Sequence, residues 1–480
     1  MNEIGSSPTR ALIGGDWVAN GSTFEVKSPY SGVVLAQVTD CGATEARRAA
    51  DHAVAAFATW RKTTAYERAA ILRRWNDLLL THQNELARLM ALEMGKPVVE
   101  ARGEVRYTAA FVEFYAEEAK RVYGETIPSQ FATKRLFALK QPVGPAFAVT
   151  PWNFPAAMIT RKAAPALAAG CTMIVKPAEQ SPLTALRVAE LWLEAGGPPG
   201  TLQVLPCADP VPVSAVLLED DRIRKLSFTG STEVGMRLYA QTSRTMKRLS
   251  LELGGHAPFL VFGDADVERA ARDVAASKYR NSGQTCVCTN RIYVHESVYD
   301  RFLEQFVPLV ASLKTGDPLD ETTQIGPLVD GDVFAKVQSH VDDAISKGAR
   351  ALVGGRAGGG TVFQPTVLSD VVPGMRILGE ETFGPVAPVI RFRDEQDVIR
   401  RANDTPVGLA AYLWTRDLSR AFRVTEALEY GIVGINDGVP STAQAPFGGV
   451  KHSGLGREGG KWGIEEYLDI KYVSMTVDEA

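Results

Sequence analysis

The chain has 480 residues, of which 45% are apolar and 22% are charged, and this balance is typical of a folded globular protein rather than a disordered one. Lys and Arg number 52 and Asp and Glu number 56, so the formal net charge is −4 and no basic surface for nucleic acid is indicated. This length allows roughly two or three domains.

The N-terminal part of the chain predicts helices. It begins with neither the basic stretch nor the apolar core of a secretory signal. Apolar residues recur at helical spacing over residues 67–94, and Gly95 followed by Pro97 ends the pattern. A second helix is expected over residues 103–121, and a β excursion over residues 123–140.

Short apolar runs separated by helical stretches predict a parallel sheet in the next part of the chain. Ligands of such sheets bind beyond the carboxyl ends of the strands. Asn153, Lys176, Gly230 and Glu252 follow or end these runs and become candidate site residues. The runs are 147–150, 173–176, 202–205, 225–229 and 249–253, with helices expected at 184–194 and 232–241.

A second alternating region begins near residue 256. The Gly-rich segment 354–360 is expected to be a surface loop. The end of the chain is Gly-rich from Gly454 and strand-like over 470–474, which suits the extension of a sheet in this chain or in a partner subunit. Strands are predicted at 287–294 and 386–392, and helices at 266–279, 297–313, 332–347 and 397–403.

No segment is expected to cross a membrane, and the cysteines suit a reducing compartment. The uncharged run over residues 141–160 contains four prolines, which a spanning helix does not tolerate. Five cysteines are too few and odd in number for a disulfide framework. We therefore expect a cytoplasmic protein.

Two glycine patterns have the spacing or position of phosphate-binding loops. The pattern Gly454, Gly456 and Gly459 follows a loop and lies outside any βαβ unit, so we do not interpret it as a nucleotide site. The segment from Gly230 to Gly235 lies between a predicted strand and a helix, where free amide groups can face a phosphate. A plain strand-to-helix turn is the alternative.

Cys286 and Glu252 are candidates for covalent and acid–base chemistry. Small residues leave room beside Cys286, and a nearby helix end would lower the pKa of its thiol. Apolar neighbours at a strand end would raise the pKa of the Glu252 carboxyl and suit it to general-base work. The alternatives are an inert buried cysteine and an exposed glutamate.

Eight segments, in order along the chain, resemble those of the aldehyde dehydrogenase superfamily. Within it, residues 152–162, 282–291 and the end from 427 most resemble succinate-semialdehyde dehydrogenases. The segments are Pro-Trp-Asn-Phe-Pro at 151–155, Val-Lys-Pro at 175–177, Phe-Thr-Gly-Ser at 228–231, Leu-Glu-Leu-Gly-Gly at 251–255, Gly-Gln-Thr-Cys at 283–286, Glu-Glu-Thr-Phe-Gly-Pro at 380–385, Pro-Phe-Gly-Gly at 446–449 and Ser-Gly-Leu-Gly-Arg at 453–457.

The resemblance implies an α/β fold with a Rossmann-like cofactor domain. That domain would comprise residues 1–122 and 143–254, and an α/β catalytic domain would comprise residues 255–445. Residues 123–142 and 446–480 would form a small β oligomerisation element. A homodimer or homotetramer is expected, with no membrane and no nucleic-acid partner.

The resemblance also implies a reaction. The Cys286 thiolate would attack the aldehyde carbon, and the Asn153 amide and the Cys286 backbone N–H would stabilise the oxyanion of the thiohemiacetal. Hydride transfer to a nicotinamide would leave a thioester, and Glu252 would activate the water that hydrolyses it. No metal is expected.

Ten residues would hold the cofactor. The Glu179 carboxylate suits a ribose diol and would repel a 2′-phosphate, so NAD is expected over NADP, with NADP as the alternative. The loop after Leu205 departs from the family pattern, which usually has a Gly-containing segment near the adenine. The cofactor residues implied are Thr150, Pro151, Trp152, Lys176, Glu179, Gly230, Ser231, Leu253, Glu381 and Phe383.

In the semialdehyde dehydrogenases that the chain resembles, positions matching Arg161, Arg291 and Ser441 bind the distal carboxylate of the substrate. Guanidinium groups suit planar anions because they form two parallel hydrogen bonds. The alternative is that each arginine pairs with an internal acid. Succinate semialdehyde is the expected substrate, with glutarate semialdehyde and 3-sulfolactaldehyde as alternatives, and His452 is interpreted as a surface residue rather than a rim residue.

Three further hypotheses stay open from the sequence. Cys288 lies two residues from Cys286, and a disulfide between them would act as a redox switch, although this spacing is strained. A protein that kept the fold and lost catalysis is a rival reading, which intact Cys286, Glu252 and Asn153 argue against. A thiol-dependent esterase that uses the same cysteine is the other rival.

Overall fold

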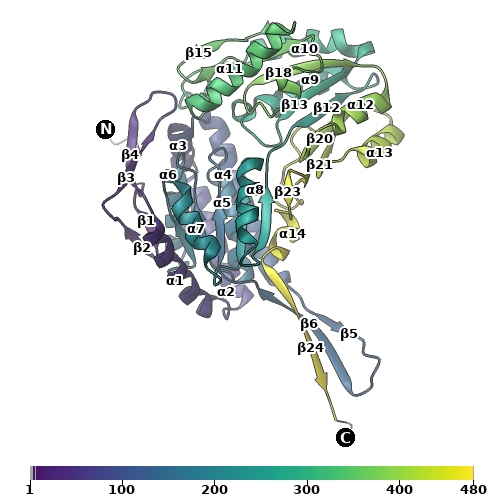
Figure 1. Ribbon diagram of the computed structural model, residues 1–480. Helices are drawn as coiled ribbons and strands as arrows, with labels where there is room; N and C mark the ends of the chain where they lie inside the picture. The colour runs from purple at the N-terminus through teal and green to yellow at the C-terminus, as the bar shows by residue number, and fades with distance from the viewer. Residues whose placement is uncertain (1–3, 6, 479–480) are drawn as a thin grey trace.

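An eight-stranded sheet forms the lower part of the body in the computed structural model, which describes residues 4–5 and 7–478 (Figure 1). Its order is β2-β1-β9-β8-β7-β10-β11-β23, and its five central strands are parallel. The strands are β1 (Ala11–Ile13), β2 (Asp16–Val18), β7 (Ala146–Val149), β8 (Met173–Lys176), β9 (Leu202–Val204), β10 (Lys225–Thr229), β11 (Arg248–Glu252) and β23 (Gly454–Leu455).

The five predicted apolar runs are these central strands, to within one residue at each end. Their register aligns the carboxyl ends, since Val149 pairs with Lys176 and Thr229 pairs with Glu252. The residues that follow these strands therefore lie along one edge of the sheet. The N-terminal strands β1 and β2, and the hairpin of β3 (Thr23–Lys27) and β4 (Val34–Thr39), were not predicted.

Helices cover both faces of this sheet and bury two apolar cores against it. The helix predicted over residues 67–94 is two helices, because the backbone leaves the helical region at His82. The helices are α1 (Ala43–Trp60), α2 (Ala65–Thr81), α3 (Gln83–Met94), α4 (Val98–Glu118), α5 (Ala157–Ala169), α6 (Pro182–Glu194), α7 (Pro210–Glu219) and α8 (Thr232–Thr242), with a 3₁₀ turn η1 (Ala119–Arg121).

A seven-stranded sheet forms the upper part of the body, in the order β14-β17-β18-β13-β12-β20-β21 (Figure 1). Its strands are β12 (Ala257–Val261), β13 (Thr289–His295), β14 (Arg350–Val353), β17 (Thr366–Ser369), β18 (Val386–Phe392), β20 (Ala410–Trp414) and β21 (Ile432–Ile435). Its helices are α9 (Val267–Tyr279), η2 (Arg280–Gly283), η3 (Glu296–Val298), α10 (Tyr299–Ala311), α11 (Gly331–Ser346), η4 (Arg376–Leu378), α12 (Glu395–Asn403) and α13 (Leu418–Ala427).

The predicted surface loop at 354–360 is exposed, but it is not wholly irregular. It contains β15 (Ala357–Gly359), which pairs with β16 (Val362–Phe363) in a small hairpin. Among residues 4–5 and 7–478, no helix combines the length and the apolar character that a membrane crossing requires.

A three-stranded sheet projects from the body as an arm (Figure 1). It consists of β5 (Glu125–Ile127), β6 (Lys134–Pro142) and β24 (Leu468–Thr476), and β24 pairs with β6 of the same chain from Leu468–Pro142 to Thr476–Lys134. The rest of the segment 446–480 lies elsewhere: β23 joins the first sheet, β22 (Val450–Lys451) pairs with β19 (Val407–Gly408), and α14 (Gly460–Glu465) contacts α5.

Candidate active site

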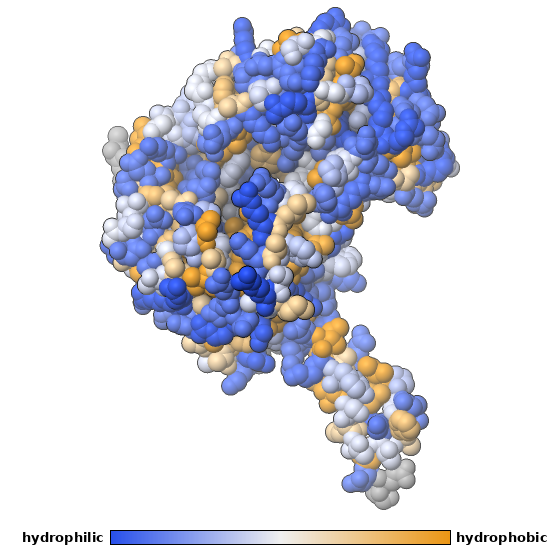
Figure 2. Space-filling model, viewed as in Figure 1, coloured by the Kyte–Doolittle hydropathy of each residue, from blue (hydrophilic) through white to orange (hydrophobic). Residues whose placement is uncertain are grey.

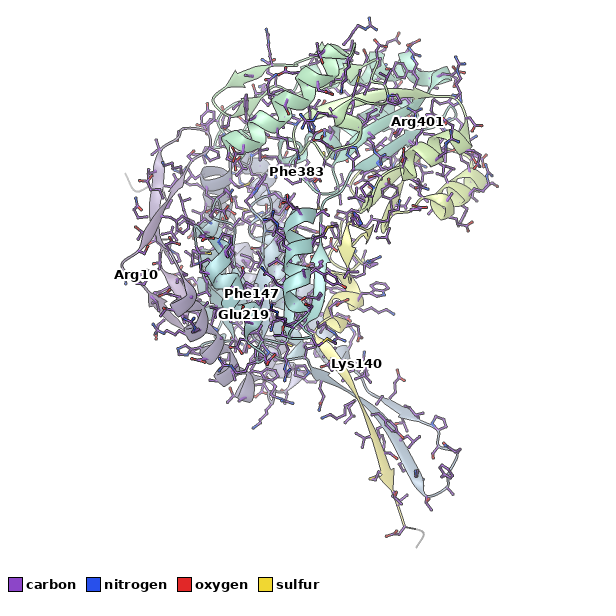
Figure 3. The ribbon with its side chains drawn as sticks, viewed as in Figure 1. Arg10, Lys140, Phe147, Glu219, Phe383 and Arg401 are labelled. Atoms are coloured by element: carbon purple, nitrogen blue, oxygen red, sulfur yellow. The ribbon has the colours of Figure 1, made fainter. Side chains whose placement is uncertain are left out.

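Two cavities meet at Cys286, where the carboxyl ends of the first sheet face the second sheet. The strand-end cavity, of about 240 Å³, is lined by Pro151, Trp152, Asn153, Thr229, Gly230, Ser231, Leu253, Gly254, Lys336, Glu381 and Phe383. The charged cavity, of about 320 Å³, is lined by Lys96, Glu100, Glu104, Tyr107, Phe154, Arg161, Arg280, Ser441 and Phe447. Cys286 and Met158 line both, and Figure 3 shows Phe383 between the two parts of the body.

The loop that carries Cys286 begins with three residues in the left-handed region. Asn281, Ser282 and Gly283 have φ values of 51°, 56° and 76°, which is costly for the first two residues. A Cβ on Gly283 would lie 2.2 Å from the Gly384 carbonyl oxygen, so only glycine fits there. The backbone N–H of Asn281 donates to Glu100 Oε2 at 2.7 Å, and Ser282 Oγ donates to the Gly326 carbonyl at 3.0 Å.

The Cys286 thiol is held in its protonated form. Burial raises its pKa to about 12, Arg161 opposes this rise and Glu252 adds to it. The sequence-based expectation of a lowered pKa is therefore wrong, because burial outweighs the cations around the thiol. Attack by this sulfur requires a base.

Glu252 ends β11 and is buried, and neither of its carboxyl oxygens has a hydrogen-bond partner among the described residues. Burial raises its pKa well above the usual range, repulsion from Glu458 adds to the rise, and Arg161 opposes it. This agrees in direction with the expectation from its apolar neighbours. A buried carboxyl with free lone pairs can exchange a proton with a ligand or a water molecule.

Asn153 is fixed by its backbone, and its side chain keeps free hydrogen-bonding capacity. Its carbonyl oxygen accepts hydrogen bonds from Lys96 Nζ at 2.8 Å and Asn281 Nδ2 at 3.1 Å. Its own Nδ2 donates to the Gln284 carbonyl at 3.1 Å. Because a side-chain amide has two N–H donors, one is left for a ligand beside Cys286.

Arg161 lies at the charged cavity and also pairs with an internal acid. Its Nη2 is 3.0 Å from Glu458 Oε2, and its guanidinium lies 4.0 Å from the centre of the Phe447 ring. Glu458 also accepts a hydrogen bond from the buried Lys162. The alternative from the sequence, pairing with an internal acid, is therefore confirmed for Arg161, and its contact with a substrate carboxylate stays a prediction.

Arg291 is not at either cavity, which corrects the sequence-based prediction. Its guanidinium donates to the carbonyls of His256, Arg401 and Ala402 and to the Tyr430 hydroxyl. Successive side chains of a strand point to opposite faces, so closeness to Cys286 in sequence did not bring Arg291 to the site. It ties β13 to the neighbouring segments instead.

Arg280 is the arginine that sequence reasoning missed. It follows α9 directly, lines the charged cavity and lies 5.3 Å from the centre of the Phe154 ring. Within the described part of the chain its guanidinium has no hydrogen-bond or ion-pair partner. The sequence signal that could have identified Arg280 was its place between helix α9 and the loop that carries Cys286, which is called the catalytic loop below. Ser441 lines the same cavity, as predicted, and Tyr107 and Phe447 were also missed.

The predicted cofactor residues divide into two groups. Seven of the ten line the strand-end cavity: Pro151, Trp152, Gly230, Ser231, Leu253, Glu381 and Phe383. Lys176 and Glu179 do not line it; Lys176 Nζ lies 3.4 Å from Glu179 Oε2 beyond the end of β8. Thr150 is buried and its N–H donates to the Lys176 carbonyl, which joins the ends of β7 and β8.

Local contacts shape this cavity. Ser231 Oγ accepts from the Val234 N–H and caps α8, and a Cβ on Gly235 would lie 2.3 Å from Leu253. Burial raises the pKa of Glu381 to about 7, and its Oε1 accepts from the Gly255 N–H at 3.2 Å. The Phe383 ring meets the Trp152 ring edge-on, with centroids 5.6 Å apart.

The remaining sequence candidates lie outside both cavities. Gly454, Gly456 and Gly459 allow close backbone packing, since a Cβ on Gly454 would lie 1.8 Å from the Leu251 carbonyl oxygen. His452 is exposed. Cys288 is free and buried, and its sulfur accepts a hydrogen bond from the buried Lys278 Nζ at 3.3 Å.

Residues 17–473 match the sequence profile of the Aldehyde dehydrogenase family. The chain is 55% identical to the succinate-semialdehyde dehydrogenase [NADP(+)] GabD of Escherichia coli, over 98% of this chain and 99% of that protein. It is 54% identical to a glutarate-semialdehyde dehydrogenase of Pseudomonas putida, over 98% of each.

The fold agrees with these sequence matches. A crystal structure of a succinate-semialdehyde dehydrogenase from Burkholderia pseudomallei superposes with a TM-score of 0.97, at 52% identity and with 98% of both chains covered. The sequence profile and the full-length relatives lead to one conclusion. The chain belongs to the aldehyde dehydrogenase family.

Proposed function

We propose that this protein oxidises a short semialdehyde with an anionic tail to the carboxylic acid, with NAD(P) as the hydride acceptor. The observation that carries this proposal is the place of Cys286, which lines the charged cavity and the strand-end cavity together. An aldehyde carbon at its sulfur would extend its tail toward Arg280, whose guanidinium is unpaired among the described residues. The names of the semialdehyde dehydrogenases that the chain resembles support the same substrate class.

The strand-end cavity suits the nicotinamide half of a dinucleotide. The capped start of α8 presents amide groups and a favourable dipole to phosphate oxygens, and Gly230 leaves room for their approach. Glu381 offers a carboxylate for a ribose diol, and Phe383 and Trp152 offer flat apolar surface. When bound there, the nicotinamide supplies the acceptor for a hydride.

The protein's own residues would carry out the covalent steps. The Cys286 thiol would first lose its proton to a solvent base, and the thiolate sulfur would then bond to the aldehyde carbon while the carbonyl oxygen becomes an oxyanion. The free N–H of the Asn153 amide and the Cys286 backbone N–H would donate to that oxyanion, and such donors are typically worth about 3–4 kcal/mol each. After hydride loss a thioester remains on Cys286. Glu252 then removes a proton from the water that attacks the thioester carbon, and the acid leaves as the thiol re-forms.

A substrate panel tests this function. We expect kcat/KM to be at least about tenfold higher for succinate semialdehyde than for an uncharged aldehyde of the same length, since one bidentate contact to a charged group is worth about 1.5–3 kcal/mol. Glutarate semialdehyde and 3-sulfolactaldehyde belong in the same panel, because one methylene changes affinity by only about 1–3 kcal/mol. An uncharged aldehyde that performs as well would overturn the anionic-tail proposal.

For the cofactor we propose NAD ahead of NADP. Glu179 places a carboxylate beside Lys176 beyond the end of β8, and a 2′-phosphate there would be repelled. Lys176 offsets part of that repulsion, so NADP is expected to be used with lower efficiency. The ratio of kcat/KM for the two cofactors measures this, and a higher value with NADP would refute it.

We also propose that the arm joins two copies of the chain. It exposes large apolar side chains from both β6 and β24, and Figure 2 shows hydrophobic residues gathered along it.

The first sheet would be the core of the cofactor domain, and the second sheet would be the core of the catalytic domain. All five cysteines are free thiols, which supports a reducing cytoplasmic location.

A further inference from the structure

The charged cavity is lined by more charged side chains than one anionic ligand would pair with. Lys96 is paired with Glu104, and Arg161 shares Glu458 with the buried Lys162, so each of these cations already has an acidic partner. Arg280 and Glu100 remain, and neither has an ion-pair partner among the described residues. The cavity therefore holds one unpaired cation and one unpaired carboxyl group.

Glu100 is also bound to the catalytic loop. It lies in the first turn of α4 and is half-buried, and its Oε2 accepts the Asn281 N–H at 2.7 Å. Asn281 is the first of the three left-handed residues that lead to Cys286. A carboxyl oxygen at this point stabilises a strained turn, and an amide oxygen could accept the same hydrogen bond.

The position of Glu100 has a consequence for bound anions. Glu100 lines the charged cavity together with Arg280, and both also line a neighbouring cavity of about 470 Å³. Its carboxylate reduces the positive potential that Arg280 presents to a negatively charged tail. A semialdehyde carries one negative charge and its dicarboxylate product carries two, so the same carboxylate opposes the product more strongly.

We infer that Glu100 is a specificity-determining and positioning residue of the charged cavity: it anchors the catalytic loop through Asn281, and its charge limits how tightly the anionic substrate and product are held. This inference rests on the proposed oxidation of an anionic semialdehyde. It gives the carboxyl group two separable roles, one through its oxygen as a hydrogen-bond acceptor and one through its charge.

Two variants of Glu100 separate these roles. Glu100→Gln keeps an oxygen that can accept the Asn281 N–H and removes the charge. For this variant we expect KM for succinate semialdehyde, and the inhibition constant of the dicarboxylate product, to fall about threefold to tenfold, which is the size of one charge interaction at partly solvated distances. Both constants for an uncharged aldehyde and its monocarboxylate product should change less. Glu100→Ala removes the anchor as well, and kcat should fall for both aldehydes.

A matched control uses another carboxylate near Arg280. Glu321 lines the neighbouring cavity, is largely exposed and pairs with Arg102. Glu321→Gln removes a charge of the same kind outside the charged cavity, and solvent screens it. We expect its kinetic constants for both aldehydes to match those of the wild type.

The outcomes distinguish this inference from the function on which it rests. If the wild type shows no preference for the anionic aldehyde, the proposed function fails. If that preference holds and Glu100→Gln leaves KM and product inhibition unchanged, only the charge role of Glu100 fails and the inference is overturned. An equal fall of kcat in Glu100→Gln and Glu100→Ala would make Glu100 a loop anchor alone, and this also overturns it.

Discussion

The protonation of two buried acids should set the pH dependence of the reaction. Burial holds the pKa of the Cys286 thiol at about 12 and that of the Glu252 carboxyl well above its usual range. An acid with a raised pKa keeps its proton up to a higher pH. The thiolate of Cys286 and the carboxylate of Glu252, which attack and hydrolysis require, therefore become available only as pH rises. We expect kcat/KM to increase with pH from the neutral into the alkaline range. Initial rates in buffers of constant ionic strength check this, and a fall over that range would contradict it.

Replacement of Glu252 should separate acylation from hydrolysis. Glu252→Gln has nearly the same size and cannot accept a proton, so water attack on the thioester should slow and kcat should fall about 100-fold to 10,000-fold. The acylated protein should then accumulate, and mass spectrometry of the intact protein after quenching would detect it. A variant with normal kcat and no acylated species would remove Glu252 from the reaction.

Replacement of Arg280, which sequence reasoning missed, and of Arg291, which it placed at the site, should have different effects. Arg280→Gln removes an unpaired cation from the charged cavity, so KM for an anionic semialdehyde should rise about tenfold to hundredfold with little change in stability. Arg291→Gln leaves buried carbonyls of His256 and Ala402 without their donors, at about 1–3 kcal/mol for each group. Its Tm should fall. Thermal unfolding and steady-state kinetics of the pair check this, and the reverse pattern would restore Arg291 to the site.

Helix α5 depends on a carboxylate from another helix. Glu104 of α4 accepts the Ala156 and Ala157 N–H groups at 3.0 and 3.2 Å and pairs with the buried Lys96, which in turn donates to the Asn153 carbonyl. Glu104→Gln would keep an acceptor and leave Lys96 without its counter-charge, which costs about 3–5 kcal/mol for a buried pair. We expect lower stability in urea and a lower kcat, since Asn153 would lose its support. An unchanged unfolding midpoint would contradict this.

Strand ends were predictable from sequence, and side-chain directions within elements were not. The central strands of the first sheet are short apolar runs, so their carboxyl ends located Asn153 and Glu252 correctly at one edge. Arg291 was misplaced because residues of a strand alternate between two faces, and the sequence gives no sign of which face meets the cavity. The lowered pKa expected for Cys286 failed for a related reason, since burial depends on tertiary packing. The break at His82 carries no glycine or proline signal and was missed.

At the scale of the whole molecule, the arm is a part of the surface where large apolar side chains of the single chain stay exposed. Ile470 and Tyr472 of β24 are exposed, and because they are two residues apart they lie on the same face of the strand, where they pair with Lys140 and Ala138 of β6. Exposed apolar side chains in a projecting sheet are typical of an interface between subunits.

Charge on this face should therefore separate the subunits without unfolding them. In a double variant, Ile470→Lys with Tyr472→Lys, the mass measured by light scattering after gel filtration should fall to that of one 51.9 kDa chain. Leu418→Lys on α13 is the matched control, because Leu418 is equally exposed and far from the arm in sequence, and it should keep the wild-type mass. A wild type that is already monomeric would refute the assembly role of the arm. Dissociation with full activity would show that each chain holds a complete site.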